Sequence, residues 1–387
     1  MTSKTYFEQQ LLLLKNQGLY RDLRLFDTST PARTDSTTNF SSNDYLGLAK
    51  DSRLMSAAVA AIGRYGTGST ASRLMAGNTE IVEQLEQDLA GMTGMEAALV
   101  FGSGFLTNLG VLASVSEEGD EIFSDELNHA SIIDGIRLSR ARCSRFRHKD
   151  LDHLEAVLRK STARGKRIIV SESVFSMDGD LAPVEGLADI ARRHDSLLII
   201  DEAHAVGVVG RNGGGVCRIA GREVQPDIVV GTLSKALGGY GGFVACSDAA
   251  RRFLVNKART FIYSTAPSPP CLGSAKEAVS IVSSHPEMGA LLLEKAREFS
   301  RLLSTCGMNV LPFESQIIPV IVGSNDKAVA FSALLGQKGL VVRAVRPPTV
   351  PPGTSRIRFS VTLSLSNEQL EQAAESTADA ARELGLV

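Results

Sequence analysis

Polar and glycine-rich segments follow several short apolar segments of the chain, each at the point where the apolar segment ends. These polar segments occupy residues 102–105, 128–129, 172–180, 201–204 and 231–239. If the apolar segments are parallel strands, their carboxyl ends lie along one edge of a sheet, where ligands bind in such folds. We therefore expect the polar segments to converge on a single site.

Lys235 is the residue of this set with the clearest chemistry. It follows the apolar segment 228–230 and lies in a glycine-rich loop next to Ser234. A lysine that is partly desolvated near other cations has a lowered pKa, and its amine then attacks aldehydes. The alternative is a lysine that binds phosphate or has only a structural role.

Asp201 and His204 form the second part of the predicted site. Asp201 ends a run of apolar residues, so its carboxylate must be paired, because burying an isolated charge is costly. The partner is either a helix N-terminus or a cationic ring nitrogen of a ligand, which His204 would also reach. The alternatives are an Asp–His pair satisfied within the core, and a zinc site for which no third ligand is evident nearby.

The turn Gly102-Ser103-Gly104 precedes a predicted helix. Backbone N–H groups at such a turn suit a phosphate, although a plain tight turn is the alternative. The segment is neither a Walker motif nor GxGxxG, since Asn108 occupies the last glycine position. His129, at the start of the next predicted helix, offers either an aromatic face to a planar ligand or a hydrogen bond to the helix N-terminus.

A phosphate cradle, a buried aspartate, a histidine and an imine-forming lysine together match pyridoxal phosphate (PLP). This cofactor needs a lysine that captures its carbonyl group and a carboxylate that keeps its pyridine nitrogen protonated. We therefore predict PLP as the cofactor, and no metal site.

The elements that must position these residues are predicted from the apolar pattern. Strands are expected at 97–101, 121–124, 167–171, 197–200 and 228–230, with helices at 107–115 and 129–140. Strands that are apolar on both faces and separated by helices indicate an α/β fold with a mostly parallel sheet covered on each side. Residues 242–246 are expected to add an antiparallel neighbour.

We predict three parts of the chain. Residues 1–45 form an N-terminal arm, and residues 46–270 form a large PLP-binding domain. Residues 271–387, after the interruption APSPP, form a smaller C-terminal α/β domain.

Local patterns predict elements inside the two outer parts. In the arm, a short amphipathic helix carries Phe7, Leu11, Leu14 and Gly18 at helical spacing, and a loop covers 27–38. The small domain is expected to contain a helical segment at 273–306 broken at 285–286, and strands at 317–322, 340–346 and 356–361.

Composition excludes several classes of protein. The 387 residues are 43% hydrophobic, and 41 basic against 43 acidic residues give a net charge of −2, with no basic excess for nucleic acid or an anionic membrane. No apolar run reaches the roughly 20 residues of a membrane span, and no signal peptide is evident. The five cysteines are far apart and odd in number, which fits free thiols in a reducing cytoplasm. We predict a cytoplasmic protein that binds neither nucleic acid nor membrane.

Six ordered stretches of the chain resemble the α-oxoamine synthases, which are PLP enzymes of fold type I, the aspartate aminotransferase-like fold. They are NFSSNDYLGLA (39–49), GTGSTASRLMAGNT (66–79), SDELNHASIIDGIRLSRA (124–141), ESVFSMDGDLAP (172–183), DEAHAVGVVG (201–210) and GTLSKALGGYGG (231–242). The resemblance covers nearly the whole chain. It implies a homodimer with the active site at the subunit interface.

The resemblance also implies roles for the cofactor-binding residues. Lys235 holds PLP as an imine and moves the substrate α-proton, Asp201 pairs with the pyridinium nitrogen, and His129 stacks on the ring. His204, with Ser176, hydrogen-bonds the ring hydroxyl. The residues expected around the phosphate are Gly104, Phe105, Thr232, Ser234 and, from the neighbouring subunit, Thr265.

Substrate residues and the reaction follow from the same resemblance. Asn43 and Arg346, beside His129, are expected to bind the substrate carboxylate, and Arg21 and Thr349 the end of the acyl chain. The stretch RPPTVP favours the branch that condenses L-alanine with a pimeloyl thioester, from coenzyme A or an acyl carrier protein, with loss of carbon dioxide, in biotin synthesis. The alternatives are a sibling that uses glycine with a short acyl thioester, a PLP aminotransferase, and a non-catalytic PLP-binding protein.

Overall fold

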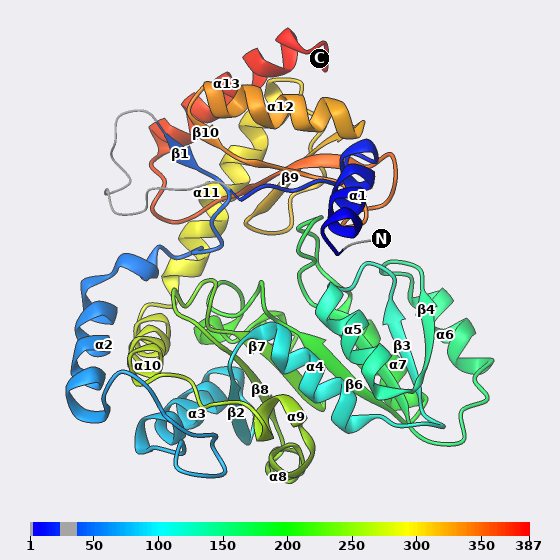
Figure 1. Ribbon diagram of the computed structural model, residues 1–387, viewed down its shortest axis with the longest axis vertical. Coiled ribbons are helices and arrows are strands. Elements are labelled where there is room, and N and C mark those ends of the chain that lie inside the picture. Colours follow the sequence, from blue (N-terminus) through cyan, green and yellow to red (C-terminus); the bar gives the residue numbers. More distant parts are fainter. Residues whose placement is uncertain (1–2, 24–36) are drawn as a thin grey trace.

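The computed structural model describes residues 3–23 and 37–387, and its main feature is a seven-stranded sheet with the order β2-β8-β7-β6-β5-β3-β4 (Figure 1). Every neighbouring pair in this sheet is parallel except those that involve β8, which runs antiparallel to both β2 and β7. The strands are β2 (Ala97–Phe101), β3 (Glu121–Asp125), β4 (Arg142–Phe146), β5 (Arg167–Glu172), β6 (Ser196–Asp201), β7 (Ile228–Thr232) and β8 (Gly242–Cys246).

Helices cover both faces of this sheet, which explains why its strands are apolar without alternation. Ile168 and Val170 of β5 pack in the cluster that contains Val111 of α4 and Ile132 of α5. Ile169 between them belongs to the larger cluster on the other face, together with side chains of α3, α7 and α10. The helices of this body are α2 (Ser52–Tyr65), α3 (Glu80–Thr93), α4 (Gly104–Val115), α5 (Ala130–Ser139), α6 (Leu151–Arg159), α7 (Val184–Arg193), α8 (Asp248–Lys257), α9 (Arg259–Ile262) and α10 (Pro269–Ser284).

A smaller antiparallel sheet with the order β11-β12-β9 lies beside the first (Figure 1). Its strands are β9 (Ile317–Gly323), β11 (Arg343–Val345) and β12 (Ser355–Ser360), and its helices are α11 (Glu287–Thr305), α12 (Asn325–Gln337) and α13 (Asn367–Glu383). The short strands β1 (Thr38–Asn39) and β10 (Leu340–Val341) form a parallel two-stranded sheet, which connects the segment before α2 to the C-terminal part of the chain. The division into 1–45, 46–270 and 271–387 stays a prediction.

The predicted elements are present, with a few differences. The helical break at 285–286 is confirmed, whereas the strand predicted at 340–346 is two short strands, β10 and β11. Strand β4 was missed because it is an edge strand with mostly exposed polar side chains. Residues 27–36 of the predicted loop 27–38 lie outside the described residues. Of the remaining two residues, Thr38 belongs to β1.

The arm contains the predicted helix, α1 (Ser3–Asn16). Its side chains Phe7, Leu11 and Leu14 are exposed, and Gly18 lies beyond its end. Within the part of the chain that the structure describes, no helix has the length and apolarity to cross a membrane.

Candidate active site

Lys235 and His204 are at the centre of the site. Lys235 follows β7, and its Nζ atom lies 2.9 Å from Nε2 of the buried His204. Burial lowers the pKa of Lys235 to about 8; Arg358 acts in the same direction, while Asp201 and Glu172 oppose it. The amine therefore loses its proton more readily than an ordinary lysine, as a nucleophile or base requires.

Asp201, the last residue of β6, is buried and held by neutral donors. Its Oδ2 atom accepts from Asn108 Nδ2 at 2.7 Å and its Oδ1 atom from the Ala203 N–H at 2.9 Å. Among residues 3–23 and 37–387, no arginine or lysine forms an ion pair with Asp201. Asn108 was noted in the sequence only as a missing glycine, and its role as the partner of Asp201 was missed.

His129 is the N-cap residue of α5, so the hydrogen-bonding interpretation of this residue is correct. Its Nδ1 atom accepts from the Ser131 N–H at 3.2 Å and lies 2.8 Å from Ser131 Oγ. Burial and Lys235 lower the pKa of His129, against the effect of Asp201. Capping uses only one ring nitrogen and leaves the face of the ring to a ligand, so the stacking role stays a prediction.

The start of α4 and the end of β7 form a close polar corner. The Oγ atom of the N-cap residue Ser103 accepts from the Leu106 N–H, and the first N–H groups of α4, including those of Gly104 and Phe105, have no partner inside the helix. Thr232 Oγ1 lies 2.8 Å from Ser234 Oγ. A Cβ atom on Gly104 would lie 3.4 Å from the Thr232 side chain, so the start of α4 and the end of β7 are in van der Waals range of each other. The corner supplies N–H and O–H donors together, which suits a phosphate.

Arg358 on β12 is a site residue that the sequence analysis missed. It donates to Ser176 O at 2.6 Å, to Asn43 Oδ1 at 3.2 Å and to Tyr45 Oη at 3.2 Å. Within the described ranges it has no carboxylate partner. The signal that could have identified it is an arginine between two apolar residues, Ile357 and Phe359, in the strand.

The predicted carboxylate ligand Arg346 lies elsewhere. It donates to the Gly18 carbonyl and lines, with Arg21, a separate cavity of about 530 Å³ between the segment after α1 and α12. Thr349 is exposed near this region. Thr265 is exposed and forms a β-bridge with Ser72. The roles of these residues stay predictions.

Glu172 adds a second carboxyl group to the site. It is the last residue of β5, opposite Asp201 in the register of β5 and β6. Its Oε1 atom is buried and has no hydrogen-bond partner among the described residues. Burial and the charge of Asp201 raise the pKa of Glu172 to about 8, against the effects of Lys235 and the backbone N–H groups of His129 and Ser176. Glu172 therefore holds its proton more readily than an ordinary glutamic acid.

A charged histidine anchors the loop that carries Ser176. His148 Nδ1 lies 3.0 Å from Asp125 Oδ1, and its Nε2 lies 2.9 Å from Asp180 Oδ2. Burial alone would lower the pKa of His148, but the hydrogen bonds to both carboxylates raise it to about 9.

The His148 contacts predict a pH-dependent stability. Because the folded-state pKa exceeds the unfolded value, the contribution is fully present below about pH 6.5 and is lost as the pH rises through about 9. We expect His148→Gln to lower the free energy of unfolding by about 2 kcal/mol near pH 6 and by much less near pH 10. Urea unfolding at both pH values checks this, with His285→Gln at an exposed site as the control. An equal loss at both pH values would contradict it.

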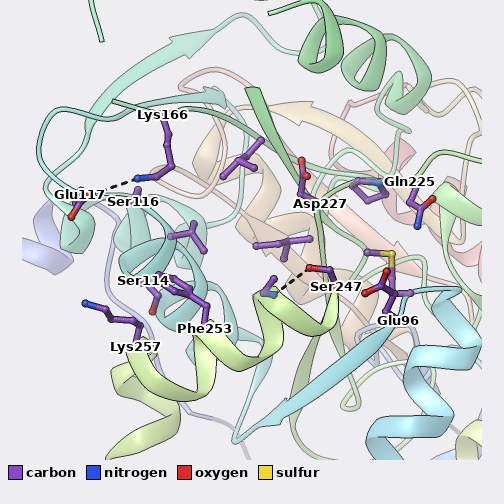
Figure 2. Close-up of a pocket in the computed structure, with 16 residues that line it drawn as sticks. Glu96, Ser114, Ser116, Glu117, Lys166, Gln225, Asp227, Ser247, Phe253 and Lys257 are labelled. Atoms are coloured by element: carbon purple, nitrogen blue, oxygen red, sulfur yellow. Dashed lines mark hydrogen bonds and ion pairs between the residues drawn. The ribbon is translucent and has the colours of Figure 1, made fainter. Parts of the chain in front are cut away.

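A larger cavity of about 810 Å³ lies at the opposite, amino-terminal edge of the sheet (Figure 2). Two of its polar lining residues have partners within the protein: Lys166 pairs with Asp120 at 2.8 Å, and Ser247 caps α8. It contains none of the predicted site residues. We therefore place the active site at the carboxyl edge, where the five polar segments meet.

The residues at the carboxyl edge fit PLP. They provide an amine with a lowered pKa, a buried carboxylate without a cationic partner, and a corner of N–H and O–H donors. The buried Oε1 atom of Glu172, without a partner, also indicates a polar ligand in this space. In the described part of the chain, no cluster of three or more metal-ligating side chains is present.

Comparison with known proteins agrees with this site. The family model for class I and II aminotransferases matches residues 35–376. An 8-amino-7-oxononanoate synthase of Lysinibacillus sphaericus is 44% identical over 98% of this chain and 99% of its own. Serine palmitoyltransferase of S. paucimobilis, with a bound PLP–myriocin aldimine, has a TM-score of 0.91 at 27% identity and covers 98% of both chains. An 8-amino-7-oxononanoate synthase of Francisella tularensis has a TM-score of 0.78 at 30% identity, over 90% of this chain and 99% of its own.

The fold and the site thus define a PLP enzyme of the class I and II aminotransferase family, and the predicted fold type I is confirmed. Within that class, the chain belongs to the family of 8-amino-7-oxononanoate synthases. The predicted resemblance to α-oxoamine synthases is confirmed.

Proposed function

We propose that this protein condenses L-alanine with a pimeloyl thioester to give 8-amino-7-oxononanoate, carbon dioxide and a free thiol, a step of biotin biosynthesis. The observation that carries the proposal is the lysine–histidine pair of Lys235 and His204 beside the buried Asp201, in a chain similar over its length to synthases of this name. The protein is a PLP-dependent acyltransferase that acts on small molecules.

PLP is the cofactor, and when bound it supplies an electron sink for negative charge at the substrate α-carbon. Lys235 would hold it, Asp201 would keep its ring nitrogen protonated, and the corner of Gly104 and Thr232 would hold its phosphate. His129 would stack on the ring, and His204 would hydrogen-bond its hydroxyl.

The chain's own residues then move protons and orient the amino acid. Lys235 Nζ takes the α-proton of alanine and later returns a proton to the product carbon. Arg358 and Asn43 bind the alanine carboxylate, because Arg358 is a guanidinium at the site without an acidic partner. This replaces Arg346 in the predicted set.

Arg358 provides a direct test of the carboxylate site. Arg358→Ala should lower kcat/KM for alanine by about 10²- to 10³-fold, since it removes a charge-assisted hydrogen bond to the substrate. Steady-state kinetics at several alanine concentrations measure this, with Arg346→Ala as the matched control. A larger effect of Arg346→Ala than of Arg358→Ala would return the role to Arg346.

The reaction is tested by release of carbon dioxide and thiol from the protein with PLP, alanine and pimeloyl-CoA, with glycine and acetyl-CoA in parallel. We expect turnover with the alanine–pimeloyl pair. Turnover with glycine and the short thioester alone would move the protein to the sibling branch. Substituting pimeloyl carrier protein identifies the natural donor.

Assembly and location belong to the same proposal. We expect a homodimer in the cytoplasm, with Thr265 reaching the phosphate in the neighbouring subunit. Thr265 and Tyr263 are exposed in the single chain, which supports this, because a residue that reaches the neighbouring subunit must lie on the surface. Light scattering of the purified protein measures the oligomeric state.

A further inference from the structure

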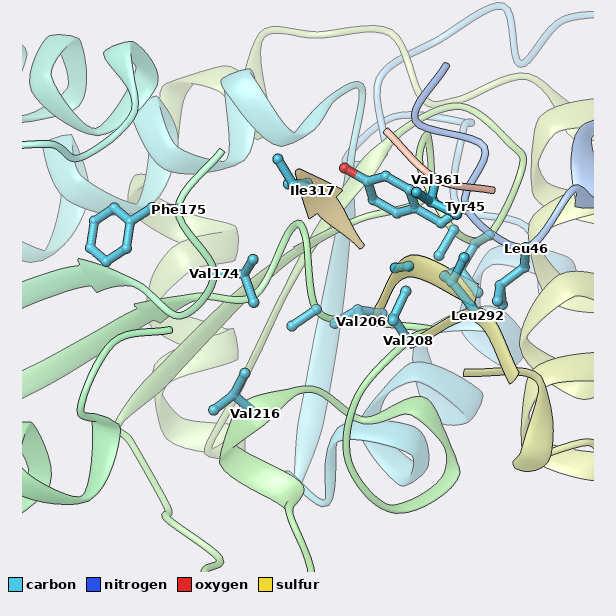
Figure 3. Close-up of a cluster of buried hydrophobic side chains, with 14 of the residues drawn as sticks. Tyr45, Leu46, Val174, Phe175, Val206, Val208, Val216, Leu292, Ile317 and Val361 are labelled. Atoms are coloured by element: carbon cyan, nitrogen blue, oxygen red, sulfur yellow. The ribbon is translucent and has the colours of Figure 1, made fainter. Parts of the chain in front are cut away.

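Tyr45 is a buried tyrosine whose hydroxyl contacts two residues of the site, His204 and Arg358. It lies between β1 and α2, and none of its surface is exposed. Its ring belongs to the cluster of buried hydrophobic side chains that includes Leu46, Val206 and Val361 (Figure 3). Because a buried tyrosine hydroxyl needs a hydrogen-bond partner, the contacts of this hydroxyl have to be explained.

The Tyr45 hydroxyl connects two halves of the site. Oη lies 2.7 Å from His204 Nδ1, and Arg358 Nη2 donates to it at 3.2 Å. It donates to Asn43 Oδ1 at 3.2 Å. Since His204 Nε2 contacts Lys235, one hydroxyl links the proposed carboxylate-binding arginine to the reactive lysine.

In the cofactor-free protein, the charge states of Lys235 and His204 define which atom donates in the hydrogen bonds of His204 and Tyr45. Burial, with the charges of Lys235 and Arg358, holds the pKa of His204 well below its usual value, so the ring is neutral. A charged Lys235 has only donors, so His204 Nε2 accepts and the single ring N–H lies on Nδ1. That N–H donates to Tyr45 Oη, and the Tyr45 hydrogen goes to Asn43.

The hydrogen bond between His204 Nδ1 and the Tyr45 hydroxyl has to reverse its direction when Lys235 holds PLP. Lys235 then no longer presents an ammonium group to His204 Nε2. If Nε2 hydrogen-bonds the ring hydroxyl oxygen of the cofactor, as proposed, its N–H has to lie on Nε2 and Nδ1 has to accept. A hydroxyl both donates and accepts, whereas a carboxylate or a carbonyl only accepts.

We propose that Tyr45 is a positioning residue whose hydroxyl accepts from His204 Nδ1 in the cofactor-free protein and donates to it when PLP is bound. His204 Nε2 thus accepts from Lys235 in the cofactor-free protein and donates to the cofactor when PLP is bound. In both states each buried ring nitrogen of His204 has a hydrogen-bond partner. No proton is gained or lost by the ring, because its single N–H moves from one nitrogen to the other by exchange with solvent. The proposal rests on the proposed PLP site and does not depend on the identity of the substrates.

The test is nitrogen NMR of the histidine rings in the full-length protein before and after PLP is added. The chain has six histidines, and His204→Gln identifies the signals of His204. We expect the N–H on Nδ1 before PLP addition and on Nε2 afterwards. The same tautomer in both states would overturn the proposal.

Tyr45→Phe provides the second measurement, because it keeps the ring in the hydrophobic cluster and removes only the hydroxyl. We expect its PLP affinity and its turnover to fall by about 10- to 100-fold, with the KM for the acyl thioester unchanged. Tyr65→Phe, at the end of α2, is the matched control and should behave like the wild type. Unchanged PLP affinity in Tyr45→Phe would also overturn the proposal. If the wild type turned over no substrate pair, the proposed function would fail, while the NMR comparison would still decide the role of Tyr45.

Discussion

Lys235→Ala is expected to abolish turnover, with a loss of more than about 10⁴-fold, because it removes both the covalent anchor and the group that moves the α-proton. The absorbance band of lysine-linked PLP should disappear as well. The fold should survive, since the side-chain contact of Lys235 with His204 is a single hydrogen bond. Absorbance spectra and product assays measure the two effects.

The control for this variant is Lys257→Ala, because Lys257 lies on α8 at the opposite edge of the sheet. Borohydride reduction of the wild-type holoenzyme, followed by peptide mass spectrometry, should find the reduced cofactor on Lys235. A label on another lysine, or turnover that survives Lys235→Ala, would remove Lys235 from its role.

Asp201→Asn is expected to lower turnover by about 10²- to 10³-fold, the loss typical when a preorganised charge is removed from an active site. The asparagine fills the same volume, so folding should be nearly intact. The Asp201 carboxylate accepts from Asn108 and Ala203 in the wild type. The neutral asparagine has no negative charge with which to keep a ligand nitrogen protonated. Asp134→Asn, at an exposed ion pair on α5, is the control.

The same variant has a second effect that does not depend on turnover. Because the charge of Asp201 contributes to the raised pKa of Glu172, removing it should shift that pKa downward. Infrared difference spectroscopy of the carboxyl groups follows this shift in the cofactor-free protein.

The turnover measurement decides the role of Asp201 in catalysis. An unchanged rate in Asp201→Asn would exclude Asp201 from the electron-sink role.

The order of elements and the cofactor chemistry could be predicted from the sequence, because these depend on local pattern. Strands such as β5 and β6 are apolar on both faces since helices cover both sides of the sheet. Asp201 ends such a strand, and His204, Lys235 and Gly104 come shortly after one. The common direction of these strands therefore brings the four residues to one edge of the sheet. The edge strand β4 lacks this pattern, and it was missed.

The partners of these residues could not be predicted, because they come from distant parts of the chain. Asn108 and Asp201 are 93 positions apart, and Tyr45 and Arg358 are 313 positions apart. No spacing rule relates such positions. The motif around Arg346 therefore predicts that residue for the substrate carboxylate, whereas Arg358 has the contacts with Asn43 and Tyr45.

The sequence by itself determined the residue types, their order along the strands, and hence the family and the cofactor. Only the tertiary structure decided which side chains surround Lys235, the charge state of Glu172 and the hydrogen bonds of His204. The physical reason is that pKa values and hydrogen-bond direction depend on burial and on neighbouring charges. Those surroundings exist only after the smaller sheet, with β12, has packed against the carboxyl edge of the larger one.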